Sequence, residues 1–188
     1  TTSRGLRPHR LPAWVGARFP DPQLLSVEAQ PSGVRVAVVT DAESIELVTP
    51  PTRLAYRGIH RPRGSIDLVV DHRLVASDRL TGGDAIQTDL QTGVTELVPG
   101  PPHLTRFTEL GAGEKLVELW LPHNEQAELV DLRADAPVAP VPRTGRRVWL
   151  HHGSSISQGS NAASASTTWP AVAAASGDVD LLNLGYSG

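Results

Sequence analysis

The stretch that decides the fold is residues 147–188, RVWLHHGSSISQGSNAASASTTWPAVAAASGDVDLLNLGYSG. RVWLHHG predicts a strand that runs into a glycine turn, and VDLLNLG predicts a continuous apolar strand of the kind buried on both faces of a parallel sheet. Between them TTWPAVAAASG predicts a short helix, with Thr168 placed to cap it, Pro170 in its first turn and Gly177 at its end. Strand, helix and strand together make one βαβ unit, the opening of a doubly wound α/β domain.

A single βαβ unit leaves open strand edges and uncovered apolar faces, so it does not stand alone. We therefore expect the domain to continue beyond Gly188 with roughly three more strands and their helices. The loops after the two predicted strands emerge at the same edge of the sheet. The sequence thus predicts that these loops meet, at the carboxyl ends of the strands where open sheets bind their ligands.

Upstream, from Trp14 to about Leu132, the chain alternates apolar and polar residues over short runs that are broken by Gly, Pro, Asp and Asn. A period of two is typical of β-strands. The apolar members of the clearest runs are Val34, Val36 and Val38; Ile45 and Leu47; Ile66, Leu68 and Val70; and Val117, Leu119 and Leu121. No convincing amphipathic helix interrupts them, which predicts an all-β antiparallel sandwich or jelly roll over residues 1–133.

The segment between these two regions is rich in proline. Residues 134–146, ADAPVAPVPRTGR, carry Pro137, Pro140 and Pro142 with almost no apolar bulk. This composition predicts an extended, semi-rigid linker. Residues 147–188 are then the first βαβ unit of a second, incomplete domain.

Composition excludes several classes of function. The formal net charge is −3, from 17 basic and 20 acidic residues, so no global field attracts nucleic acid or an anionic membrane. The chain has no Cys, hence no disulfide framework, thiolate metal site or cysteine nucleophile. Its longest apolar stretches fall far short of the ~20 residues of a membrane helix, which predicts a soluble protein with no membrane partner. The first ten residues are polar and basic, unlike a secretory signal, and a start at Thr1 after removal of an initiator Met favours the cytoplasm, although secretion stays open.

Three interpretations compete for the loop that begins at Gly153. A phosphate-binding P-loop needs GxxxxGK, but Gly153 and Gly159 are one residue too far apart and Ser160 stands where Lys is required. A dinucleotide site needs GxGxxG, which neither this loop nor NLGYSG supplies. The third interpretation is a nucleophile loop, because Ser155 follows the first strand closely and has small neighbours that leave room for a substrate.

Two motifs and one longer segment resemble a known family. HGSSISQGS, residues 152–160, resembles the first conserved block of the GDSL/SGNH hydrolases, in which a serine is held in a GDSxTxG-like run after the first strand. NLGYSG, residues 183–188, resembles the second block of that family. VELWLPHNEQAELVDL, residues 117–132, is similar to the closing strands of the β-sandwich that precedes the hydrolase domain in some two-domain members. The resemblance implies a flavodoxin-like SGNH domain after a sandwich.

Carried over to this chain, the resemblance makes Ser155 the nucleophile and its backbone N–H one oxyanion donor, with the N–H of Gly188 as a second. A serine hydroxyl needs a base to take its proton, and the oxyanion that forms needs prepositioned donors. Position 154 is Ser where the family name implies Asp, but that Asp is not the nucleophile, so we expect activity to persist. The family's oxyanion Asn and its Asp and His base would lie beyond residue 188.

Other conspicuous residues have simpler interpretations. Adjacent strand residues point to opposite faces, so at most one of His151 and His152 faces the site, and neither has an evident orienting carboxylate; packing is favoured over a base or metal role. His103 and His123 are predicted as surface loop residues, with no spacing that suggests a metal site.

Trp120 is either a sugar-stacking platform or a residue packed against the second domain, and packing is favoured. Trp169 is predicted as a core anchor. The stretch YRGIHRPRG, residues 56–64, either binds an anionic group or forms a solvated hairpin loop, of which the loop is favoured.

The leading hypothesis is therefore a serine esterase that acts on a small-molecule or carbohydrate acyl ester through an acyl-enzyme on Ser155. An acyltransferase that passes the acyl group to an alcohol in biosynthesis uses the same machinery. A hypothesis of another class is a carbohydrate- or partner-binding β-sandwich joined to a catalytically inactive α/β piece. No metal or organic cofactor is implied, and nucleic acid is not an expected partner.

Overall fold

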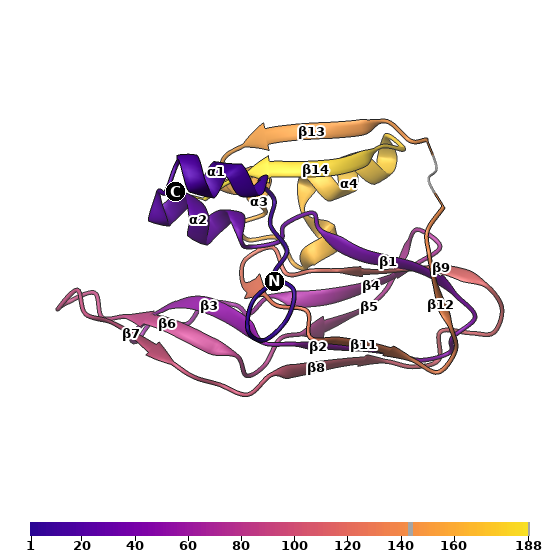
Figure 1. The fold of residues 1–188 in the computed structure, drawn as a ribbon, viewed down its shortest axis with the longest axis horizontal. Helices are drawn as coiled ribbons and strands as arrows, with labels where there is room; N and C mark the ends of the chain where they lie inside the picture. The colour runs from indigo at the N-terminus through magenta and orange to yellow at the C-terminus, as the bar shows by residue number, and fades with distance from the viewer. Residues whose placement is uncertain (143–144, 188) are drawn as a thin grey trace.

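The computed structural model describes residues 1–142 and 145–187. It consists mostly of β-strands in several sheets, with few helices (Figure 1). The elements up to residue 142 are α1 (Ala13–Arg18), α2 (Pro22–Glu28), β1 (Arg35–Thr40), β2 (Ile45–Thr49), β3 (Pro51–Tyr56), β4 (Ser65–Val70), β5 (Arg73–Arg79), β6 (Asp84–Thr88), β7 (Thr95–Val98), β8 (His103–Phe107), β9 (Lys115–Trp120), β10 (Gln126–Ala127), β11 (Asp131–Ala134) and β12 (Val138–Pro140). The later elements are β13 (Val148–Gly153), α3 (Ser155–Gln158), the 3₁₀ turn η1 (Ala165–Thr167), α4 (Trp169–Ser176) and β14 (Asp180–Gly185).

The strands of the described residues form four sheets. The largest has the order β12-β1-β9-β4-β5, with every neighbouring pair antiparallel, and a second antiparallel sheet has the order β11-β2-β8. The third sheet is β10-β3-β6-β7, in which β3 and β6 are parallel, so the prediction of purely antiparallel pairing is wrong there. The reason is that the chain leaves this sheet for β4 and β5 before it returns as β6, and such a crossover brings the strand back in the same direction. The fourth sheet is the parallel pair β13-β14.

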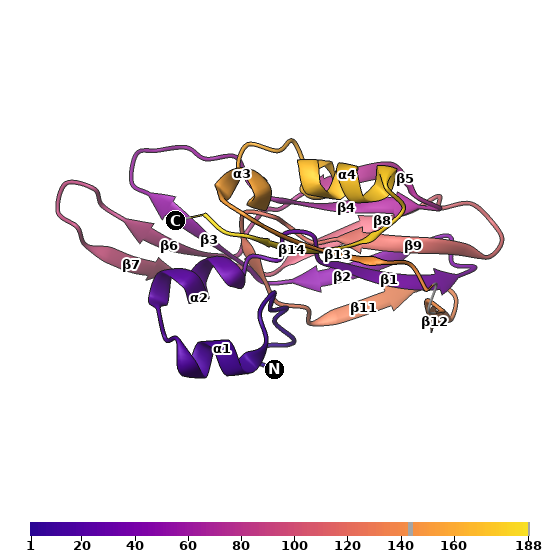
Figure 2. The same cartoon turned by 90° about the horizontal axis from the view of Figure 1, so that it is seen from above.

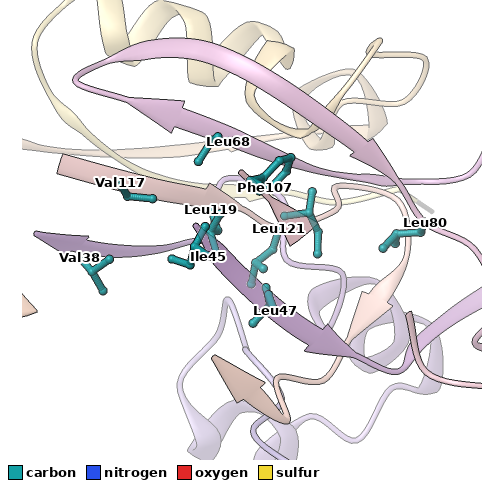
Figure 3. Packing of buried hydrophobic residues seen from close by; sticks show 10 residues of the cluster. Val38, Ile45, Leu47, Leu68, Leu80, Phe107, Val117, Leu119 and Leu121 are labelled. Atoms are coloured by element: carbon teal, nitrogen blue, oxygen red, sulfur yellow. The ribbon is translucent and has the colours of Figure 1, made fainter. Parts of the chain in front are cut away.

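The predicted alternation of apolar residues builds the main core. Their side chains gather between the β1-β9-β4 part of the largest sheet and the strands β2 and β8 (Figure 3). The buried members are Val38, Ile45, Leu47, Ile66, Leu68, Leu80, Phe107, Val117, Leu119 and Leu121. Partly buried Val34, Val36 and Val70 pack against them, so all the predicted inward positions are confirmed. Burial of each such side chain contributes about 1.5–3 kcal/mol relative to an exposed position.

The opposite face of β4 and β9 is also covered, by the C-terminal segment. Val69 and Trp120 point away from the main core and pack with Ala171 and Ala174 of α4 and with Leu181 of β14. The segment therefore forms a further layer above the largest sheet (Figures 1 and 2). The prediction that Trp120 packs against the later part of the chain is confirmed.

The C-terminal segment has the predicted strand, helix and strand. Thr168 occupies the N-cap position of α4 without a side-chain cap bond, a proline lies in the first turn and Gly177 ends the helix. β13 and β14 pair in parallel from Val148 with Asp180 to Gly153 with Gly185. The described residues cover only one face of this pair, since Leu182 is 43% exposed, contrary to the expected burial on both faces. Trp169 is likewise 45% exposed, so the prediction of a core anchor is wrong.

Two short helices precede the first strand, where the sequence predicted none. α2 begins after Asp21, whose carboxylate accepts a 2.7 Å hydrogen bond from the N–H of Leu24, and a proline occupies its first turn. These are ordinary helix-start signals. Both helices are too short to display an amphipathic repeat, so periodicity does not detect them.

Within the proline-rich residues 134–146, β12 pairs with β1 at the edge of the largest sheet, for example Val39 with Ala139. An edge position suits prolines because it leaves one side without ladder hydrogen bonds. No helix among the described residues is both long and apolar enough to cross a bilayer.

Candidate active site

Ser155 lies at the junction of β13 and α3. β13 ends at Gly153, Ser154 occupies the N-cap position and Ser155 is the first helical residue. α3 crosses the carboxyl ends of both parallel strands because two glycines leave room for it. A Cβ on Gly185 would lie 2.6 Å from the backbone nitrogen of Gln158, and one on Gly153 would collide with the hydroxyl of Ser157. Contacts below 3.0 Å force a rearrangement, so the position of α3 depends on both glycines.

The loops that carry the two motifs meet, as the parallel strands predict. The N–H of Tyr186 donates a 3.0 Å hydrogen bond to the carbonyl of Gly153 at the end of β13. The N–H of Ser187 donates a 2.6 Å hydrogen bond to the side-chain oxygen of Gln158 in α3. Gly188, the predicted second oxyanion donor, lies outside the described residues, but the backbone that leads to it is fixed beside α3.

The hydroxyl of Ser155 makes no hydrogen bond among the described residues, whereas its carbonyl accepts from the N–H groups of Gly159 and Ser160. Ser157 differs, because it is buried and its hydroxyl lies 2.9 Å from Nε2 of His151. The Ser157 hydroxyl is also enclosed by the glycine turn at Gly153. Ser155 is therefore the more accessible hydroxyl of the two.

His151 is a packing residue at the end of β13, as predicted. Its ring lies 4.9 Å from the ring of Trp149 and 4.8 Å from that of Trp169, centroid to centroid. His152, the next residue, is exposed on the other face. Neither histidine hydrogen-bonds Ser155 in the described structure, so neither is placed to act as its base.

A network of polar side chains from distant parts of the chain anchors α3. Ser32 donates a 2.5 Å hydrogen bond to the carbonyl of Gln158, and the side-chain amide of Asn183 donates to Ser32 and to the carbonyl of Ser157, at 2.9 and 2.8 Å. The amide of Gln158 also donates to the side-chain oxygen of Gln30. These partners lie far apart in the sequence, and no motif identified them.

Arg10 binds the end of β14. Its buried guanidinium donates hydrogen bonds to the carbonyls of Gly185, Asn183 and Val27, at 2.6, 3.2 and 2.7 Å. It also lies 4.4 Å from the centroid of the Tyr186 ring. Burial lowers the pKa of Arg10 to about 10, so it remains charged at neutral pH. The N-terminal segment thus holds the strand that leads to the second motif.

Asp67 in β4 holds the far end of the loop that follows α3. Its carboxylate accepts hydrogen bonds from the hydroxyl of Ser164 and from both the N–H and the hydroxyl of Ser166, all at 2.6–2.7 Å. Ser65 and Ser77 donate to its other oxygen. Burial acts to raise the pKa of Asp67, but the hydrogen bonds from Ser164, Ser77 and Ser166 outweigh it and lower the pKa.

His103 and His123 are buried, so their prediction as surface loop residues is wrong. His103 opens β8, where its Nε2 lies 2.8 Å from a carboxylate oxygen of Asp78 and its Nδ1 accepts from the N–H of Thr81 at 3.2 Å. His123 lies under Gly159, and burial lowers its pKa. Both side chains are covered by segments distant in sequence, which local composition does not indicate.

The basic residues of the stretch 56–64 lie in different environments. Arg57 pairs with Glu96 at 2.8 Å, and Arg63 forms a two-pronged pair with Glu125. Arg61 is exposed beside the ring of Tyr56.

Among the described residues, no group of three or more His, Cys, Asp or Glu side chains is arranged to hold a metal ion.

The fold is similar to solved structures of ester-processing enzymes. The salicylyl-acyltransferase SsfX3 from a tetracycline biosynthetic pathway superposes with a TM-score of 0.82 at 27% identity, over 100% of this chain and 49% of that one. A GDSL-like lipase from Bacteroides ovatus superposes with a TM-score of 0.71 at 19% identity, over 99% of this chain and 52% of that one. The acetyl xylan esterase Est2A from the rumen bacterium Butyrivibrio proteoclasticus gives 0.53 at 14% identity, over 83% and 40%.

The chain spans about half the length of the first two structures. No family model matches the sequence, and no curated protein matches it. The likeness of the whole chain to SsfX3 agrees with the two motif-bearing loops that meet beside Ser155. These structural neighbours support a relation of the chain to the GDSL/SGNH hydrolases.

Proposed function

We propose that the protein is a serine hydrolase or acyltransferase that processes a small-molecule or carbohydrate acyl ester through Ser155. The observation that carries the proposal is the meeting of the two motif-bearing loops at the carboxyl ends of β13 and β14, with an accessible Ser155 at the start of α3. This edge is where open α/β sheets bind their ligands.

In the proposed reaction the hydroxyl oxygen of Ser155 attacks the ester carbonyl carbon, while a base takes the hydroxyl proton. The N–H groups of Ser155 and Gly188 stabilise the resulting oxyanion. Collapse of this intermediate expels the alcohol, which takes up the proton, and leaves an acyl group on Ser155. Water or a second alcohol then attacks the acyl-enzyme by the same steps and regenerates the serine.

The base is not assigned to a described residue. His151 donates to or accepts from Ser157 and is held between two tryptophan rings, and His103 and His123 are buried elsewhere. The proposal therefore takes the base, and the Asp that orients it, from a segment beyond residue 188, as the family resemblance implies. Under the same proposal, residues 1–133 are a β-sandwich domain, residues 134–146 a linker and residues 147–188 the start of the α/β domain.

Transfer to an alcohol is the second candidate reaction. The observation in its favour is that SsfX3, an acyltransferase, is similar to this chain over its whole length at 27% identity. Hydrolysis and transfer differ only in which nucleophile reaches the acyl-enzyme, so the pocket's exclusion of water decides between them.

The test is hydrolysis of 4-nitrophenyl acetate by the full-length protein. Because the catalytic residues of a serine hydrolase act as a unit, Ser155→Ala should reduce kcat by about 10³-fold or more. Ser154→Ala, one residue away on the exposed side, is the matched control and should retain kcat within about threefold. Equal loss in both variants, or none in Ser155→Ala, contradicts the proposal. Addition of a primary alcohol then separates the two reactions by the fraction of transesterified product.

A further inference from the structure

A groove of about 1050 Å³ lies beside the candidate active site. One part of its lining comes from the loops that carry the two motifs, through Gln158, Ser160 and Ser187. Other parts of the lining come from α2, from β3, from the end of β5, and from the segments 61–63, 123–125 and 161–163. Ligand sites typically enclose about 300–1,000 Å³, so the groove is large enough for a substrate that extends away from Ser155.

The groove is strongly basic, although the chain as a whole carries a net charge of −3. Arg53, Arg61, Arg63 and Arg79 line it, and Glu125 supplies its one carboxylate among the described lining residues. We call this feature the arginine groove. Glu125 is occupied by Arg63, whose Nε and a terminal nitrogen lie 2.7 and 2.9 Å from its two oxygens. The other three guanidinium groups of the lining therefore have no carboxylate in the groove that neutralises their charge.

These three arginines form no salt bridge in the described structure, and two of them contact neutral groups instead. In the described structure Arg53 and Arg61 form no ion pair, and Arg79 donates a 2.9 Å hydrogen bond to the carbonyl of Arg63. The guanidinium carbon of Arg61 lies 5.2 Å from the ring centroid of Tyr56. Like charges that share one concave surface raise its potential and attract anions.

We propose that the arginine groove binds a carboxylate or phosphate group carried by the substrate, so that the enzyme prefers anionic esters. The planar guanidinium presents paired N–H donors that match either group, and such charge-assisted bonds are the strongest that arginine forms. The preference for anionic esters rests on the proposed function, whereas anion binding itself does not. Arg53 and Arg61 bind the anionic group of the substrate, and its ester group lies toward Ser160 and Ser187.

The first test measures anion binding without catalysis. Inorganic pyrophosphate is titrated calorimetrically into the full-length protein that carries Ser155→Ala, with and without the pair Arg53→Gln and Arg61→Gln. Loss of charge-assisted bonds should weaken binding by at least about tenfold. Arg73→Gln is the matched control, since Arg73 is exposed on β5, forms no ion pair in the described structure and does not line the groove. Absence of pyrophosphate binding, or equal binding by all variants, overturns the proposal.

The second test asks where on the substrate the anion lies. In the catalytically competent protein, kcat/KM for 4-nitrophenyl hemisuccinate is compared with kcat/KM for 4-nitrophenyl pentanoate. The hemisuccinate carries a negative charge on its acyl group, and the pentanoate is its neutral counterpart. 4-Acetoxybenzoate and its methyl ester place it on the alcohol side. The proposal predicts a preference for the anionic ester of at least one pair, reduced about tenfold or more by the two arginine substitutions and retained by Arg73→Gln.

A preference that survives loss of Arg53 and Arg61, or no preference in either pair, overturns the assignment of the groove to the substrate. If none of the four esters is hydrolysed, the proposed function fails, and pyrophosphate binding alone then decides whether the groove is an anion site. The two failures are therefore distinguishable.

Discussion

The carboxylate of Asp67 in β4 accepts a 2.6 Å hydrogen bond from the hydroxyl of Ser164, which lies 97 positions later in the chain. This bond joins the largest sheet to the loop between Ser155 and α4. Ser166 adds two more bonds to the same carboxylate oxygen. A buried carboxylate with this many donors is strongly stabilised in its ionised form. Without the carboxylate, each donor would be left without a partner.

We predict that Asp67→Asn destabilises the protein by about 2–4 kcal/mol, because the amide presents N–H groups to the hydroxyl and N–H donors of Ser164 and Ser166. Urea unfolding measures the change. Asp131→Asn removes an exposed ion-paired carboxylate and should alter the free energy of unfolding by less than about 0.5 kcal/mol. A cost for Asp67→Asn no larger than that of Asp131→Asn would show that the connection is not stabilising.

The same carboxylate should affect acid stability. Its folded pKa is lowered, so the stability it contributes is present above the unfolded value of about 3.8 and is lost as pH falls through the folded pKa. The difference in unfolding free energy between the natural protein and Asp67→Asn should thus shrink as pH is lowered below about 4. Urea unfolding at a series of pH values from 6 to 3 checks this, and a difference that stays constant or grows contradicts it.

His123 should make stability pH-dependent in a higher range. Burial lowers its folded pKa below the usual value, so the neutral form stabilises the protein above about pH 6.5, and this contribution is lost as pH falls toward the folded pKa. His123→Gln should remove up to about 1.4 kcal/mol per pH unit of this dependence. Identical slopes in the natural protein and His123→Gln would contradict the assignment.

Arg10 should control the order of the loop after β14. Arg10→Gln removes a buried cation from the carbonyls of Gly185 and Asn183, and we expect a loss of about 2–4 kcal/mol together with faster hydrogen exchange at the N–H groups of Tyr186 and Ser187. Arg18→Gln, on the exposed end of α1, should change neither quantity. Unchanged exchange at these two amides in Arg10→Gln would contradict this role.

Gly185→Ala should displace α3, since the added Cβ would lie 2.6 Å from the backbone nitrogen of Gln158. Backbone atoms give way poorly, so we expect a cost of about 1–3 kcal/mol and a loss of esterase activity. Gly177→Ala is the matched control, because its Cβ would meet nothing nearer than 3.3 Å. Equal stability and activity of the two variants would show that α3 does not depend on close approach at Gly185.

Local sequence predicted the strands and the two loops well. The alternation at Ile66, Leu68, Val117 and Leu119 depends only on the period of the strand, and burial of one face follows directly. The meeting of the two loops follows from the parallel pairing of two strands that each end in a glycine motif.

The supports of the site were not predictable in the same way. Arg10, Asp67 and Asn183 are polar residues whose hydrogen-bond partners are carbonyls, hydroxyls or backbone N–H groups on other elements. No spacing of residues in the sequence indicates such pairs. His123 looked like a loop residue because proline and polar residues surround it, yet α3 and its glycine turn cover it. Burial by distant segments overrides local composition at these positions.

If Ser155 is the nucleophile, a reagent that modifies activated serines should form a covalent adduct at this residue. The full-length protein is treated with a fluorophosphonate, digested and mapped by tandem mass spectrometry over residues 148–170. We expect one phosphonyl group per chain, on Ser155, and none in Ser155→Ala. An adduct on Ser157 or another residue, or labelling that persists in Ser155→Ala, would contradict it.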